Sequence, residues 1–275
     1  MNDEYSKVNM IDQIAISVSS PKNYKHLTKL KTSKTVAFMI LISFILVFME
    51  LGIGFITFLV HVGGLDNLIN NKITPFVYEN GKLSAENEMA LDIGDMIIYI
   101  NTDYDEISLE DMDTDGVYLA FGAENMVMGI VSGTSVYEYM TMELTEFADM
   151  GLLTEGFDNE ALASTIPIFY TSMVLVYIFS MIGKIIETLI YALIFSIIAR
   201  VLAKNLNTGL SYGNVLRVCI YGQTLCQLLT SANNCAGLIS GSIMYIIYFI
   251  VSYVFISRGI ASHAKNPEAP PEDWV

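Results

Sequence analysis

Three charged residues lie inside stretches that are otherwise long and apolar. Glu50 stands near the middle of the apolar run 36–61, and Lys184 and Glu187 stand in the run 166–200. A charge inside a bilayer is costly, so such groups are expected to pair with one another or to line a wet cavity. We therefore expect an ion pair between Glu50 and Lys184, with Glu187 on the same helix face because it lies three residues further on.

This intramembrane cluster has two possible roles. It could be a proton or ion relay, or it could be a structural clasp that joins two helices. A transport path usually displays more polar positions than these two apolar runs contain. The sequence therefore favours the clasp and leaves the relay open.

Two glutamines extend the polar set into a third, weaker apolar segment, 212–230. Gln223 and Gln227 are four residues apart and would share one helix face. Amide side chains in such a position are expected to donate hydrogen bonds to a neighbouring helix or to a second subunit. Close helix approach would be permitted by three nearby glycines, Gly209, Gly213 and Gly222.

A run of alternating aspartates is a weak candidate for calcium. Asp111, Asp113 and Asp115 precede Gly116 in the spacing that opens an EF-hand loop. The twelfth position, however, is Gly122 rather than a bidentate glutamate, and residues 117–121 have the composition of a strand. The pattern favours a solvated acidic turn over a calcium site.

The sequence contains no recognisable set of catalytic residues. It has no nucleophile elbow, no HExxH motif and no glycine-rich phosphate loop. The cysteines Cys219, Cys226 and Cys235 lack metal-ligand spacing. The histidines are scattered at the edges of the apolar runs: His26, His61 and His263. We therefore expect a protein that is not an enzyme and that has no cofactor and no resident metal.

Composition indicates the elements that must hold these residues. The 275 residues are 53% hydrophobic and only 16% charged, and the mean hydropathy is +0.49. Residues 63–165 contain 21 of the 29 acidic residues and two of the 14 basic residues, a net charge of −19, which leaves +4 for the remainder. This separation predicts an acidic water-facing domain and basic membrane flanks, and it argues against a nucleic-acid partner.

The positions of the basic residues predict how the chain crosses a membrane. If 166–200 crosses once, then Arg200, Lys204, Arg258 and Lys265 all fall on the side of the N-terminal lysines, which the positive-inside rule assigns to the cytoplasm. Splitting that run at Gly183 would leave almost no turn and would place most of these charges outside. We therefore expect four transmembrane helices, at 36–62, 166–203, 212–230 and 238–257, with a cytoplasmic N-terminal segment (1–35) and a cytoplasmic tail (258–275).

A lysine-rich stretch precedes the first expected helix. Residues 1–16 have a mixed composition and are expected to be loosely ordered, and Ser20-Pro21 then begins a short helix. Its apolar residues Tyr24, Leu27 and Leu30 form a narrow stripe beside five lysines, Lys22, Lys25, Lys29, Lys31 and Lys34. This pattern favours a helix on an anionic membrane surface. A solvated basic flank is the alternative.

The acidic segment 63–165 has the pattern of a small β-rich domain with some helix. Asn80-Gly81 between apolar runs predicts a hairpin turn, because these residues adopt positive φ readily. Residues 96–100 predict a buried strand, and 117–121 with 126–130 predict a second hairpin. Residues 139–152 fit either a strand or a short helix. We expect this domain, inserted between the first two membrane helices, to lie outside the cytoplasm.

Several of these stretches resemble one family of uncharacterised membrane proteins of Gram-positive bacteria. The resemblance rests on four stretches: 20–25, 79–84, 100–102, and Tyr191-Ala192-Leu193 leading to Arg200. This family is known as domain of unknown function 1189 and is sometimes labelled maltodextrin-utilisation protein MalA. It commonly has Asp-Thr where Asn101-Thr102 stands here. The resemblance implies a bacterial plasma-membrane protein with an extracytoplasmic domain and an association with sugar utilisation.

Together these patterns predict a non-enzymatic multi-pass protein of the plasma membrane. Its outer domain would bind or sense an unidentified small molecule or partner, with a possible accessory role in carbohydrate uptake. Its partners would be the lipid bilayer and another membrane protein or a second copy of itself. The alternative is a transporter subunit or small permease with an intramembrane polar path.

Overall fold

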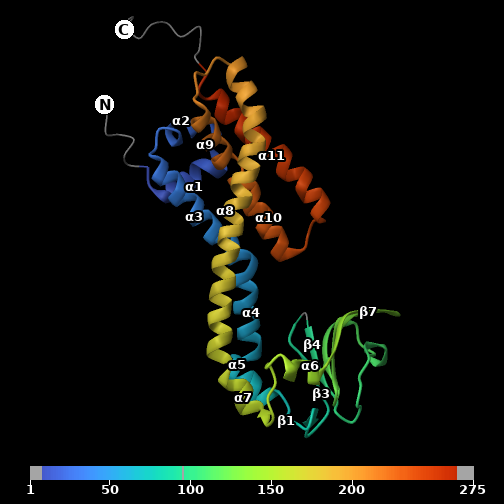
Figure 1. Cartoon of the computed structure of the whole chain (residues 1–275). Coiled ribbons are helices and arrows are strands. Elements are labelled where there is room, and N and C mark those ends of the chain that lie inside the picture. The colour runs from blue at the N-terminus through green and yellow to red at the C-terminus, as the bar shows by residue number, and fades with distance from the viewer. Residues whose placement is uncertain (1–7, 95, 265–275) are drawn as a thin grey trace, which may run out of the picture. The chain divides into compact units, whose positions relative to one another are not determined.

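The computed structural model describes residues 8–94 and 96–264, so the outer parts of the two terminal segments (1–7 and 265–275) lie outside the described residues. The chain divides into two compact units (Figure 1). The helical unit combines both ends of the chain, Met1–Gly54 and Leu175–Val275, and the β-rich unit is Phe55–Val174. The expected class, apolar helices with a β-rich domain inserted after the first of them, is therefore present.

Among the described residues, three helices are long and apolar enough to cross a membrane. The first runs from Thr32 to Val62 as α3 (Thr32–Val47), the π-helical turn η3 (Phe48–Gly52) and α4 (Ile53–Val62). The second is α8 (Ile166–Asn205), and the third is α11 (Gly241–Ala261). The prediction that 166–200 forms one helix rather than two is confirmed. At 1.5 Å per residue α8 is about 60 Å long, roughly twice the thickness of a hydrocarbon core.

The expectation of one continuous helix at 212–230 is wrong. Two shorter helices stand there, α9 (Tyr212–Gly222) and α10 (Thr224–Ala236), with Gln223 between them. Gly222 packs so closely against Ile256 of α11 that a Cβ on it would come 2.5 Å from the Ile256 Cγ1. Gln223 is fully buried and bonds outward to two other helices. The break between α9 and α10 coincides with this close packing and with the side-chain bonds of Gln223. Helix α10 then continues past the expected end to Ala236, and Gly237, with φ +63°, terminates it.

Residues 10–16, which the sequence predicted to be loosely ordered, belong to a helix. Helix α1 (Met10–Ser19) begins with a capping box, in which the side chains of Asn9 and Asp12 each accept a hydrogen bond from the other's backbone N–H. The turn η2 (Pro21–Asn23) and the single-turn helix α2 (Tyr24–Leu27) follow. This arrangement fixes the N-terminal segment against the helical unit.

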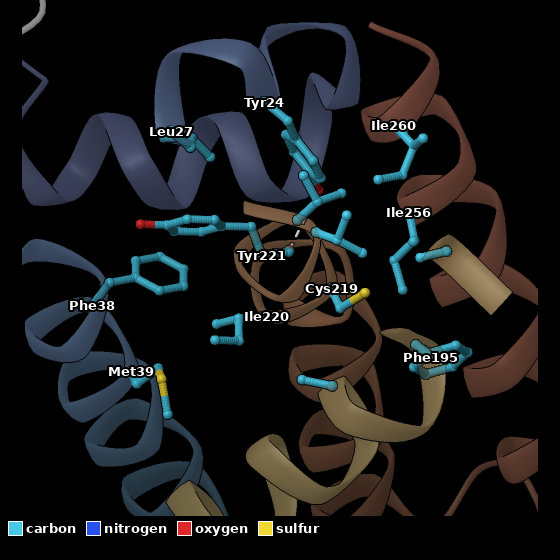
Figure 2. Packing of buried hydrophobic residues seen from close by; sticks show 14 of the residues in the cluster. Tyr24, Leu27, Phe38, Met39, Phe195, Cys219, Ile220, Tyr221, Ile256 and Ile260 are labelled. Carbon is cyan, nitrogen blue, oxygen red and sulfur yellow. Dashed lines mark hydrogen bonds between the residues drawn. The ribbon is translucent and has the colours of Figure 1, made fainter. Parts of the chain in front are cut away.

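The apolar stripe of this segment packs inside the protein and not on a membrane surface. Tyr24, Leu27 and Leu30 belong to the main core of the helical unit. Figure 2 shows Tyr24 and Leu27 in this core. The Tyr24 hydroxyl donates to the carbonyl oxygens of Ser17, at 2.7 Å, and Tyr221, at 3.3 Å. The expected membrane-facing role of the stripe is therefore corrected. Of the five lysines, Lys22, Lys25, Lys29 and Lys31 are exposed and Lys34 is half-buried.

Contacts inside the helical unit bring its first and last segments together. The Arg217 guanidinium on α9 donates to the carbonyl oxygens of Thr28 and Leu30, at 2.9 and 2.7 Å. His263, just after α11, lies 3.0 Å from the Thr28 hydroxyl through its Nε2. The beginning of α3, the beginning of α9 and the end of α11 therefore lie at the same end of this unit.

The described residues of the β-rich unit form two sheets. One has the strand order β2-β1-β8 and the other β3-β4-β5-β6-β7. The strands are β1 (Phe76–Glu79), β2 (Lys82–Ala85), β3 (Met89–Asp92), β4 (Met96–Ile100), β5 (Gly116–Phe121), β6 (Asn125–Ser132), β7 (Ser135–Glu143) and β8 (Phe157–Asp158). The short helices are α5 (Leu65–Asn67), η4 (Leu68–Lys72), η5 (Leu109–Asp111), α6 (Leu144–Asp149) and α7 (Asn159–Ser164).

Both expected hairpins are confirmed. In the first, β1 and β2 pair antiparallel around Asn80 and Gly81, which have φ values of +52° and +79°. In the second, β5 pairs antiparallel with β6. The stretch 139–152 contains the end of β7 and all of α6, so both expected alternatives occur in succession. Strands β4 and β5 are parallel, and the crossover between them packs on one face of the sheet through Ile107 and Leu109.

Candidate functional site

Glu50 owes its position to an irregularity in its helix. It lies in the π-helical turn η3, and such turns are rare and are often found at functional sites. Gly52 allows the turn, because a Cβ there would come 2.6 Å from the Phe48 ring. The Glu50 side chain is mostly buried within the helical unit.

The expected contact between Glu50 and Lys184 is present in the structure. Lys184 Nζ lies 3.1 Å from Glu50 Oε1 and 3.4 Å from Glu187 Oε2. The same Glu50 oxygen accepts hydrogen bonds from Ser231 Oγ at 2.6 Å and from Asn234 Nδ2 at 3.3 Å, both on α10. One carboxylate therefore joins η3, α8 and α10. The ammonium of Lys184 thus lies between the carboxyl groups of Glu50 and Glu187.

A second polar group lies one helical turn further along α8. Gln223 Nε2 donates to the Thr188 carbonyl at 2.9 Å, and Gln227 Nε2 donates to the Thr188 hydroxyl at 2.7 Å. The Tyr248 hydroxyl of α11 donates to Gln223 Oε1 at 2.7 Å. The sequence predicted hydrogen bonds from these amides to a neighbouring helix or to a second subunit, and both amides donate to α8 within the chain. Thr188 also donates to the Lys184 carbonyl at 2.8 Å, which links this group to the charged one.

A small cavity borders both polar groups. It has a volume of about 150 Å³ and is lined by Lys184, Glu187, Gln227 and Ser231, among others. The Thr230 hydroxyl also lines it, and this oxygen is buried without a hydrogen-bond partner among the described residues. A cavity of this size and polarity has room for several water molecules. The paired charges therefore border a space that is large enough for water.

Sequence reasoning missed four members of this network: Thr188, Ser231, Asn234 and Tyr248. A signal for two of them was available. Gln223, Gln227, Ser231 and Asn234 follow one another at intervals of four, four and three residues, which places them on one helix face. The expected segment ends at residue 230, so it leaves out Ser231 and Asn234 of this face.

The other sequence candidates do not form a site. Asp111, Asp113 and Asp115 are exposed, and the Asp115 carboxylate accepts a hydrogen bond from the Gly133 N–H at 2.7 Å. No group of three or more His, Cys, Asp or Glu side chains within the described residues could hold a metal ion. The calcium hypothesis is therefore not supported.

The β-rich unit contains a larger cavity, which sequence reasoning also missed. Its volume is about 420 Å³, and it is lined by fourteen residues, all of them apolar. On the five-stranded sheet, Ile98, Ile100, Leu119 and Phe121 face it, and the alternate residues Tyr118 and Ala120 face the core on the other side. Leu144 and Phe147 of α6 also line the cavity. The alternation predicts an apolar face on each strand, but only the packing of α6 and the two sheets reveals that space remains between them.

Neither the curated proteins nor the solved structures contain a match for this chain. One family model, described as protein of unknown function (DUF1189), matches residues 11–260. This match covers both units and most of the 275 residues. The chain therefore belongs to the DUF1189 family.

Proposed function

We propose that this chain is a non-enzymatic protein of the bacterial plasma membrane whose β-rich unit lies outside the cytoplasm and binds a ligand. The apolar cavity of the β-rich unit is the observation that carries this proposal. Its volume of about 420 Å³ falls within the range of roughly 300–1,000 Å³ that is usual for small-molecule sites. A well-packed core of this size would be expected to leave few voids larger than a water molecule.

The lining of the cavity restricts the ligand. Sugar hydroxyls need hydrogen-bond partners when they are buried, and the fourteen lining side chains supply none. The role in carbohydrate uptake that the family resemblance implies therefore has no support from this cavity. An apolar molecule, or the apolar part of a larger one, fits it better.

The proposed orientation is supported by charge and by contacts within the helical unit. Arg217 and His263 bond to the segment that precedes α3, so α9 begins and α11 ends where the first long helix begins. Helices α9 and α10 together contain enough residues for one further pass. Four passes would then return the C-terminal segment to the cytoplasm, on the side of the N-terminal lysines.

Native mass spectrometry of the full chain, purified from its own membranes, tests the ligand. We expect a bound small molecule on the wild type and on Tyr139→Trp, which changes an exposed residue of β7. We expect its loss from Leu119→Trp, which fills the cavity. Equal occupancy in the wild type and Leu119→Trp, or no bound molecule on either, would contradict the proposal.

The polar cavity of the helical unit favours a second candidate function, that of a transporter subunit or small permease. Polar side chains of α8 and α10 line this cavity, and the Thr230 hydroxyl there has no partner among the described residues. Glu50 of η3 accepts a hydrogen bond from one lining residue, Ser231, and the whole set is more than a simple clasp requires. Ion flux into proteoliposomes that contain the full chain tests this candidate. Flux that Glu50→Gln abolishes would support transport, whereas equal leakage with and without the protein would leave the cluster as a clasp.

A further inference from the structure

The cavity of the β-rich unit carries an inference that rests on the proposed function and names its ligand class. Leucine, isoleucine, phenylalanine and methionine make up its entire lining. Such a wall offers no partner to a hydroxyl, amide or charged group, so any polar atom inside it would lose its hydrogen bonds. The part of the ligand that enters must therefore be hydrocarbon.

The wall of the cavity is continuous with the membrane-proximal apolar cluster of the same unit. Ile73, Ile98 and Leu162 line the cavity and also belong to this second cluster. The cluster includes Leu59 and Val62 near the end of α4, and Ile166 at the beginning of α8. Helix α4 belongs to the first long apolar segment, and α8 is the second; each segment is long and apolar enough to cross a bilayer. Apolar side chains thus extend without interruption from these helix ends to the wall of the cavity.

The cavity also has a mouth at the chain segment after α6. Leu152 lines the cavity, yet 61% of its surface is exposed. Exposed carboxylates flank this segment in sequence, at Asp149 and Glu155. Residues 63–165 as a whole carry a net charge of −19. An anionic fatty acid would be repelled from such a surface, whereas a lipid with a neutral or zwitterionic headgroup would not.

From these observations we propose that the β-rich unit binds an acyl chain of a zwitterionic or neutral bilayer lipid in the cavity between α6 and its two sheets. The headgroup stays outside the cavity, and the acyl chain contacts Leu119, Phe121 and Ile98. An acyl chain in the cavity would fill an apolar void and make van der Waals contacts with its wall, without any polar contact.

Photocrosslinking in a bilayer tests this inference. The full chain is reconstituted into nanodiscs of phosphatidylcholine that contain a fraction with a diazirine at the end of one acyl chain. After irradiation, labelled residues are mapped by peptide mass spectrometry. We expect labels on the membrane helices and also on β4 or β5. Labelling of these strands should fall about tenfold in Leu119→Trp, equivalent to roughly 1.4 kcal/mol of binding free energy, and should be unchanged in Tyr139→Trp.

The wild-type map alone can overturn the inference, even if Leu119→Trp folds poorly. Labels confined to α3, α8 and α11 would contradict it, and so would undiminished strand labelling in a folded Leu119→Trp. A parallel reaction with a diazirine fatty acid checks the source, and strand labelling by the fatty acid alone would exclude the bilayer lipid. If native mass spectrometry then still found another bound molecule, the acyl-chain inference would fail while the proposed function stood.

Discussion

Glu50 is the residue on which the polar contacts of the helical unit converge. One of its carboxylate oxygens pairs with the Lys184 ammonium and accepts hydrogen bonds from Ser231 and Asn234. These three partners lie on two other helices. A carboxylate in an apolar helix is stable only if such partners compensate for its lost hydration. Glu187 pairs with the same ammonium but leaves 47% of its side chain exposed. The pair Glu50 and Lys184 is therefore expected to contribute most of the cluster's effect on stability.

Removing the lysine alone should cost more than removing both members of that pair. We expect Lys184→Met to lower the free energy of unfolding by about 3 kcal/mol, because Glu50 then stays buried without a counter-charge. The double variant Glu50→Gln/Lys184→Met should lose less. Thermal unfolding of the purified chain in detergent measures the difference.

Glu187→Gln is the matched control for this comparison. Since its carboxylate is half exposed, its loss should change the free energy of unfolding by less than about 1 kcal/mol. A double variant less stable than Lys184→Met would show that Glu50 and Lys184 do not stabilise each other.

His263 should make the helical unit sensitive to pH. Burial lowers the pKa of its imidazole, and the nearby Lys25 and Lys29 lower it further, although the hydrogen bond with the Gly259 carbonyl opposes this. In the unfolded chain the pKa is about 6.5. As the pH falls below that value, the unfolded state takes up a proton that the folded state resists, so stability is lost.

Unfolding midpoints of the full chain, measured between pH 8 and pH 5, test this linkage. This range includes the unperturbed histidine pKa of about 6.5. We expect the wild type to lose stability toward low pH and His263→Gln to lose less. Parallel pH profiles of the two proteins would show that His263 does not contribute. His26 is the comparison residue for this test, because burial, Lys25 and Lys29 lower the pKa of its imidazole too.

At the scale of elements, the long helices follow directly from the sequence. The run 166–200 is long and almost wholly apolar, with Lys184 and Glu187 the only charges before Arg200, and such a run predicts one membrane-spanning helix. The break between α9 and α10 could not be predicted in the same way. It coincides with the contact between Gly222 and Ile256, which lie far apart in the sequence. Of the three glycines expected to permit close helix approach, Gly222 does so, whereas Gly209 and Gly213 have open space around them.

This contrast between glycines predicts opposite effects of the same substitution. We expect Gly222→Ala to lower the free energy of unfolding by about 1–3 kcal/mol, because the added methyl group collides with Ile256. Gly213→Ala, on the exposed side of α9, should be neutral or stabilising by up to about 1 kcal/mol, since alanine favours a helix. Thermal unfolding of the two variants decides the matter. Equal effects at both positions would mean that α9 and α11 do not pack closely at Gly222.

At the scale of the whole molecule, the order of the parts could be predicted, whereas the binding surfaces could not. Charge segregation located the acidic β-rich segment, and turn residues such as Asn80 and Gly81 located its hairpins. The apolar cavity depends on how α6 packs against two sheets, and no local pattern encodes that. The stripe containing Tyr24 and Leu27 was assigned to a membrane surface for a related reason. Periodicity shows that a face will be buried but not what will bury it.

The central claim is that the β-rich unit lies outside the cytoplasm while α8 ends inside it. Single cysteines at Ser135 of β7 and at Lys204 of α8, each in a Cys235→Ser background, test it directly. A membrane-impermeant maleimide is applied to intact cells of a bacterium that lacks an outer membrane. We expect Ser135→Cys to be labelled at once and Lys204→Cys only after permeabilisation. Labelling of Lys204→Cys in intact cells, or protection of Ser135→Cys, would contradict the proposed orientation.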